Sequence, residues 1–179
     1  SDVTGIIGFN YTSTASNDSV VVTGINSLWT NSGAITVGSS GPLSSLTISN
    51  GGMVRSASAI IGSSSSSSNN TLLITGTNSV LNTTSLTVGN SGGGTLTVAN
   101  GGAVTGATNI ILGSLASSVG TINIGADGGT DSAGTVSTPV ITVGAGRGTV
   151  NFNQTNSATF TNQFQRGTNV VINQLGSGM

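Results

Sequence analysis

The stretch SLTVGNSGGGTLTVANGGAV, residues Ser85–Val104, holds two short runs that alternate apolar residues with threonine, Leu86–Val88 and Leu96–Val98. A period of two residues is typical of a β-strand that buries one face and exposes the other. A glycine-rich turn separates the two runs. Asn100 and Gly101 follow the second run, and these residue types adopt positive φ angles with little strain. The stretch therefore predicts two strands with tight turns between and after them.

The same pattern recurs along the chain. Ile35–Val54 has the sequence ITVGSSGPLSSLTISNGGMV, and Ile141–Phe152 holds a degenerate copy, ITVGAGRGTVNF. A short apolar run ending in glycine occurs six times, with 24 to 31 residues between successive glycines: Gly8, Gly38, Gly62, Gly89, Gly113 and Gly144. A second run follows each of these, and a weaker third run begins at Leu28, Met53, Val80 and Ala103. This periodicity identifies the chain as a repeat protein.

A unit of about 25 residues with two or three short strands cannot bury its apolar side chains by itself. When such units stack, each strand pairs with its copies above and below at about 4.8 Å, and the inward side chains form rows. The sequence therefore predicts an all-β fold, a β-solenoid of six to seven coils that forms one domain over residues 1–179. Helices are not expected, since Gly, Ser, Thr and Asn dominate and apolar residues lack helical spacing.

The inward positions follow from the alternation within each run. In the first strands we expect them at Ile35, Val37, Ala59, Ile61, Leu86, Val88, Ile110, Leu112, Ile141 and Val143. In the second strands we expect them at Val20, Val22, Leu46, Ile48, Leu72, Ile74, Leu96, Val98, Ile122, Ile124, Val150 and Phe152. Phe152, Phe160 and Phe164 are expected to cover the core of the last coil, because the terminal units of a stack need a cover.

The outward positions alternate between apolar and polar coils. Ile6, Ile60 and Ile111 occupy alternate first strands, with threonine between them, and Val21 and Leu73 do the same in the second strands. One interpretation is that Ile, Val and Leu stand there for their high β-propensity. The other is that these five residues form a surface for a partner. We take them as candidate partner-binding residues.

The composition excludes several classes of function. Charged residues make up 4% of the 179 residues, against about 25% in ordinary domains, and the net charge is −1. Nucleic acids and acidic membranes require clustered Lys and Arg, so neither is an expected partner. The chain has no Cys, His, Lys or Glu, which leaves no disulfide, no thiol and no general base for a Ser or Thr nucleophile. We therefore expect neither enzymatic activity nor a cofactor.

Asp127 and Asp131 lie in GADGGTDSAG, within a glycine-rich insert that departs from the repeat. Two carboxylates four residues apart are compatible with a Ca²⁺ site or with an acid–base pair. A Ca²⁺ ion requires six to eight oxygen ligands, however, and a solvated loop accounts for both residues. No metal site is therefore expected, and we keep Asp127 and Asp131 only as candidate partner contacts.

Residues 22–54, VTGINSLWTNSGAITVGSSGPLSSLTISNGGMV, resemble the repeat of bacterial type V autotransporter passengers. Ile74–Val104 has the same pattern with Leu81 in place of the tryptophan, and Gly148–Gly178 resembles the segment that follows such repeats. The resemblance implies a right-handed parallel β-helix and a protein that is exposed on the bacterial surface or secreted. The insert Gly125–Pro139 and the short turn Gly144–Gly148 depart from the family pattern.

The resemblance also implies a function. We expect a fragment of a longer passenger that contacts host cells as an adhesin-like virulence factor, through a host cell-surface protein or glycan or through self-association. The first alternative is a released passenger that acts as a soluble ligand of a host receptor. The second is a carbohydrate-active enzyme, which the residue inventory disfavours. The irregular loops Phe9–Asn17 and Gly125–Thr138 are the first candidates for contact, since loops on a rigid scaffold commonly carry function. Membrane insertion by this fragment is not expected.

Overall fold

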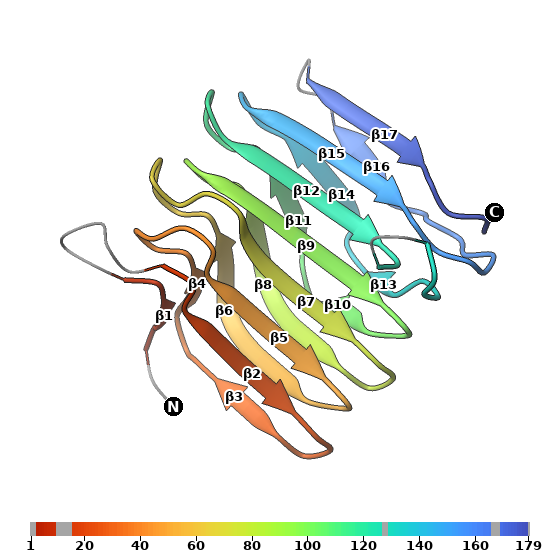
Figure 1. Cartoon of the computed structure of the whole chain (residues 1–179), viewed down its shortest axis with the longest axis horizontal. Helices are drawn as coiled ribbons and strands as arrows, with labels where there is room; N and C mark the ends of the chain where they lie inside the picture. The colour runs from red at the N-terminus through yellow and green to blue at the C-terminus, as the bar shows by residue number, and fades with distance from the viewer. Residues whose placement is uncertain (1–2, 10–15, 127–128, 166–168, 179) are drawn as a thin grey trace.

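The computed structural model describes residues 3–9, 16–126, 129–165 and 169–178. Regular structure in these ranges consists of β-strands, and no helix there is long and apolar enough to cross a membrane. The strands pair in parallel with strands about 26 residues away and stack as a β-solenoid of about six turns. Figure 1 shows the colour changing steadily from one end of the stack to the other, so chain order is also spatial order. The predicted fold class is confirmed.

Two parallel sheets form the walls of the solenoid (Figure 1). The first sheet contains, in spatial order, β1 (Gly5–Ile7), β4 (Ala34–Val37), β6 (Met53–Ile61), β8 (Val80–Val88), β11 (Asn109–Leu112), β14 (Val140–Val143) and β16 (Gln163–Gln165). The second sheet contains β2 (Ser19–Thr23), β5 (Ser45–Ser49), β7 (Asn70–Thr75), β9 (Gly93–Ala99), β12 (Val119–Ile124), β15 (Arg147–Phe152) and β17 (Val170–Gln174).

The third strands extend the first sheet. β3 (Leu28–Thr30) pairs with the start of β6, and β10 (Ala103–Thr105) pairs with the start of β8 and with β13 (Thr135–Val136). In the central coils the third strand runs directly into the next first strand, so β6 and β8 are each nine residues long. The sequence predicts separate short strands there, and the structure corrects that prediction. No glycine, proline or Asn-Gly pair interrupts β6 or β8, whereas Gly106, at φ 81°, separates β10 from β11.

The core consists of rows of stacked apolar side chains, as the alternation predicts. Val88 lies in register between Ile61 and Leu112, and its side chain is 0% exposed. All ten inward positions predicted for the first strands are buried, and so are the second-strand positions apart from Val20 and Phe152. Those two are half-buried and lie toward the ends of the stack, where neighbouring coils cover them less completely.

Left-handed residues close the coils at recurring positions. Asn50 and Gly51 have φ angles of 51° and 84°, and Asn100 and Gly101 have 52° and 77°, as the predicted turn chemistry requires. Gly89, at φ 74°, ends its strand beside the backbone carbonyl of the next coil. A Cβ at Gly89 would overlap that carbonyl, so both the backbone angle and the packing require glycine.

Three phenylalanines cover part of the C-terminal end of the core. The rings of Phe152 and Phe160 meet edge to face at 5.1 Å, and those of Phe160 and Phe164 stack at 5.9 Å. All three side chains pack against the buried core, which confirms the predicted cover. The cover is incomplete, because Ile172, in the last strand of the second sheet, is 51% exposed.

Candidate functional site

The structure places the predicted outward isoleucines on one row of the first sheet. Ile6, Ile60 and Ile111 alternate in register with Thr36 and Thr87, so neighbouring isoleucines are two strands apart, or about 10 Å. Ile6 is 51% exposed, while Ile60 and Ile111 are half-buried. The row is a spaced series of apolar groups rather than a continuous patch, and its role in partner binding stays a prediction.

The outward row of the second sheet changes character along the stack. Its N-terminal part alternates Val21 and Leu73 with threonine, and Val21 is 59% exposed. Its C-terminal part is an asparagine ladder, defined by Asn123, Asn151 and Asn173. The Nδ2 of Asn173 donates to Oδ1 of Asn151, and the Nδ2 of Asn151 donates to Oδ1 of Asn123, each at 2.8 Å. Neighbouring coils are therefore linked by side-chain amides as well as by the backbone.

The glycine-rich insert is fastened to the neighbouring coils by polar contacts. Asp127 lies outside the described residues, and Asp131 is half-buried. The backbone carbonyl of Asp131 accepts hydrogen bonds from the N–H and the Oγ1 of Thr155 at 3.0 and 3.3 Å. The Oδ1 of Asn100 accepts from the backbone N–H and hydroxyl of Ser132, both at 3.3 Å. The described ranges contain no group of three or more side chains suited to hold a metal ion.

The other candidate loop, Phe9–Asn17, lies mostly outside the described residues. Of its described members, Phe9 is 50% exposed, and Asn17 adopts a φ of 65°. The N–H of Asn17 donates to the carbonyl of Pro42 at 3.2 Å, which attaches the end of this loop to the next coil.

Sequence reasoning identified the third runs but not the outward apolar row that their first residues form. Leu28, Met53, Val80 and Ala103 are consecutive partners in register, and none of them is fully buried. Ile25, 80% exposed, adjoins Leu28 at a shallow hollow of about 420 Å³. The signal was present in the sequence, since each of these strands begins with an apolar residue followed by a second apolar residue.

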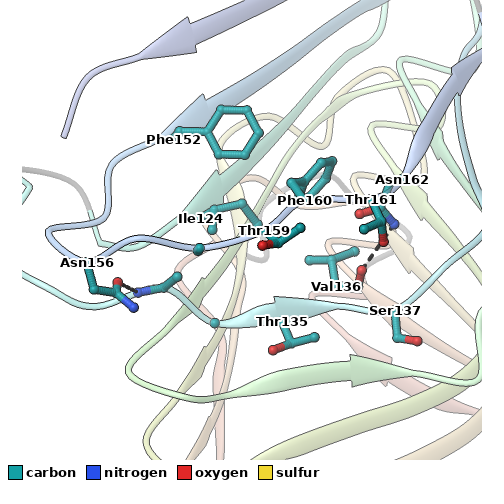
Figure 2. A pocket seen from close by; sticks show the side chains of 13 residues that line it. Ile124, Thr135, Val136, Ser137, Phe152, Asn156, Thr159, Phe160, Thr161 and Asn162 are labelled. Carbon is teal, nitrogen blue, oxygen red and sulfur yellow. Dashed lines mark hydrogen bonds between the residues drawn. The ribbon is translucent and has the colours of Figure 1, made fainter. Parts of the chain in front are cut away.

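Sequence reasoning also missed a groove beside the insert, shown in Figure 2. This β13 groove lies between β13 and the segment 156–162 and has a volume of about 380 Å³. Apolar side chains line its inner part and uncharged polar groups its rim, among them Ile124, Val136, Phe152, Phe160, Asn156, Thr159 and Asn162. In a regular stack, the third strand of the next coil would lie at this position and pair with β13.

Two asparagine side chains bridge the β13 groove near its ends (Figure 2). The Oδ1 of Asn156 accepts the backbone N–H of Ala133 at 2.7 Å. The Nδ2 of Asn162 donates to the carbonyls of Val136 and Thr138 at 3.1 and 2.6 Å. Side-chain amides thus take the place of strand-to-strand bonds here, and the groove between them stays open.

The chemistry that these features offer is recognition by shape, apolar contact and neutral hydrogen bonds. None of the residues lining the β13 groove is charged. The outward rows through Ile60 and Asn151 consist of aliphatic, threonine, asparagine and glutamine side chains. A scan against protein-family models and searches of curated proteins and of solved structures return no match for this chain.

Proposed function

We propose that this chain is part of a bacterial autotransporter passenger, exposed on the cell surface or secreted, that contacts host cells as a non-enzymatic adhesin. The observation that carries the proposal is the outward row of alternating Ile and Thr on a continuous parallel sheet. Regularly spaced apolar groups on a stiff surface can meet a protein or glycan without ordering a flexible chain, and this lowers the entropic cost of binding.

Two further features support a contact role. The outer rows are almost free of charge, so binding would depend on apolar area and neutral hydrogen bonds rather than on electrostatic steering. The insert and the β13 groove interrupt the regular surface and supply the shape that a uniform row of threonines lacks.

The test is binding of the purified chain to cultured host cells, measured by flow cytometry with a labelled protein. We expect the double variant Ile60→Thr with Ile111→Thr to bind at least fivefold more weakly, because it removes two apolar contacts and leaves the inward rows intact. The matched control is Thr87→Val, which changes the same row without removing an apolar group.

Wild-type chain that fails to bind host cells would refute the proposed function. Equal binding by the double variant and the wild type would refute the role of the row. Binding that is accompanied by phosphorylation of a host receptor would favour the alternative of a soluble signalling ligand over a simple adhesin.

A further inference from the structure

We infer that the β13 groove is a binding site for an extended, uncharged peptide segment of a partner protein, which adds to β13 as a short parallel strand. The inference rests on the proposed contact function and names the chemical class of ligand for one site on the molecule. Three observations carry it: the direction of the free backbone groups of β13, the apolar floor of the groove, and the absence of charge from its lining.

The backbone of β13 presents one free acceptor and one free donor to the groove. The N–H groups of Thr135 and Ser137 donate to the carbonyls of Gly102 and Val104, at 2.9 Å each. Because peptide bonds are trans, the carbonyl of Gly134 and the N–H of Val136 must then point away from β10. Neither group has a hydrogen-bond partner among the described residues.

These two groups favour a parallel strand over an antiparallel one. In a parallel pair, an incoming residue opposite Thr135 donates its N–H to the carbonyl of Gly134. The carbonyl of the same residue accepts the N–H of Val136. An antiparallel partner would reach the same two groups through two different residues, and would leave one N–H and one C=O of its own unpaired, because their partners on this side are occupied. The carbonyl of Val136 is already taken by Asn162, and the N–H of Gly134 by the carbonyl of Val98 at 3.1 Å.

The side chains of the groove specify what the next peptide residue should be. Val136 continues the inward row of Val54, Leu81 and Val104, and it is 6% exposed. In a parallel strand the residue after the hydrogen-bonded one points to the same face as Val136. An apolar side chain there would meet the small exposed part of Val136 and the half-buried ring of Phe160, both of which line the groove (Figure 2).

The chain's own segment does not fill this position. Residues 157–161 run beside β13 in the next coil, yet no backbone hydrogen bond joins them to β13 in the described ranges. In the described ranges, the hydrogen bonds that cross the groove come from the side chains of Asn156 and Asn162, and a strand that adds to β13 would take the place of these amides. The free groups of β13 are therefore available to another chain, as in strand addition at an exposed sheet edge.

The experiment is an NMR titration of the ¹⁵N-labelled chain with the capped peptide acetyl-Thr-Val-Thr-amide. We expect saturable shifts of the Thr135, Val136 and Ser137 amides, and slower hydrogen exchange at Val136. The matched probe carries an N-methyl group on its first threonine and cannot donate to Gly134. It should bind about five- to tenfold more weakly, the effect of losing one hydrogen bond.

A protein variant provides the second arm. Val136→Pro removes the N–H that points into the groove and no bond to β10, and proline is tolerated at such an edge. Its peptide affinity should fall at least fivefold, whereas Val136→Ala, which keeps the N–H, should still discriminate against the N-methylated peptide. Thermal melting verifies that both variants fold, and the N-methyl comparison in the wild-type chain decides the matter without them.

Three results would overturn the inference. One is equal affinity for the two peptides. Another is a shift of the same amides by lactose but not by either peptide, which would assign the groove to a neutral saccharide. The third is slow exchange of the Val136 amide without peptide, which would mean that residues 157–161 close the groove. Host-cell binding without peptide binding would overturn this inference alone, whereas peptide binding without host-cell binding would refute only the proposed function.

Discussion

The central coils and the coils toward the C-terminus are built from the same repeat, but they differ in whether each strand pairs with a neighbouring strand on both sides. In the centre, β6 and β8 pair along eight residue positions, and each strand has a partner on both sides. Toward the C-terminus, β13 is two residues long, and among the described strands it pairs with β10 and with no strand of the next coil. The segment that should cover it lies across a groove and is tied to it by asparagine side chains.

The difference shows how a solenoid obtains a specific site. A coil with a neighbour on each side satisfies its backbone and its apolar rows, so its surface is regular and offers little shape. Where the repeat degenerates, backbone groups and part of the core lose their neighbours. The backbone groups and apolar side chains that lose their neighbours can then bind a partner. Four substitution pairs test this contrast, beginning with the largest expected effect.

The strongest contrast is between a charge in the central core and a charge at the C-terminal end. Val88→Asp buries a carboxylate without a partner and should lower the free energy of unfolding by about 4 kcal/mol or more. Ile172→Asp, at a position that is 51% exposed, should cost under about 1 kcal/mol. Urea denaturation followed by circular dichroism measures both. Similar midpoints for the two variants would mean that burial does not distinguish the regions.

Glycine positions separate backbone strain from close packing. Gly89→Ala combines a φ of 74° with overlap against the next coil, and should cost about 3 kcal/mol in unfolding free energy. Gly24→Ala has a φ of 94° but its nearest contact is Ser27 Oγ at 3.6 Å, so it should cost about 1–2 kcal/mol. Thermal melting of both variants checks the ranking. If the Gly24 variant were the less stable of the two, close coil stacking would not be the dominant constraint.

The phenylalanine cover should contribute less than an inner core side chain. Phe160 is only half-buried, so Phe160→Ala should lower the unfolding free energy by about 2 kcal/mol, below the value for a fully buried ring. The comparison variant is Leu115→Ala, at a turn position that is 53% exposed, and it should cost well under about 1 kcal/mol. Equal denaturation midpoints would contradict the covering role of Phe160.

The smallest expected effect is in the asparagine ladder. Asn151→Leu removes hydrogen bonds to both neighbouring coils at a half-exposed position, so a loss of about 1 kcal/mol is expected. Thr47→Leu, at the matching outward position near the N-terminus, should change stability by under about 0.5 kcal/mol. A ladder variant as stable as the Thr47 variant would show that the amide bonds add nothing to the backbone pairing.

Sequence patterns predicted the stack and its rows because those features repeat locally. The positions of Val88 and its neighbours follow from a two-residue period within each strand and a recurring glycine between coils. Merging of the third strands into β6 and β8 was not predicted, since short runs of Ser, Ala and Thr are compatible with either a bend or a strand. The surrounding pairs on both sides decide the outcome by holding those residues extended.

The candidate residues divide in the same way. The outward row of Ile6, Ile60 and Ile111 was foreseen, because a row depends only on the repeat. The insert was a candidate because it departs from the repeat. In the structure, Asp131 contacts the neighbouring coil through its backbone carbonyl, which accepts the N–H of Thr155. The β13 groove had no local signal, since Val136 and Phe160 look like ordinary strand and cover residues in the sequence.

By itself, therefore, the sequence determined that the chain stacks, which side chains lie inward, and that charged side chains are few. These follow from periodicity and composition, which are properties of the chain in one dimension. Only the tertiary structure decided where stacking stops. The distance between β13 and residues 156–162 depends on how Asn156, Asn162 and the phenylalanines pack together. The asparagine contacts join residues that are far apart in the sequence, so no local pattern predicts them.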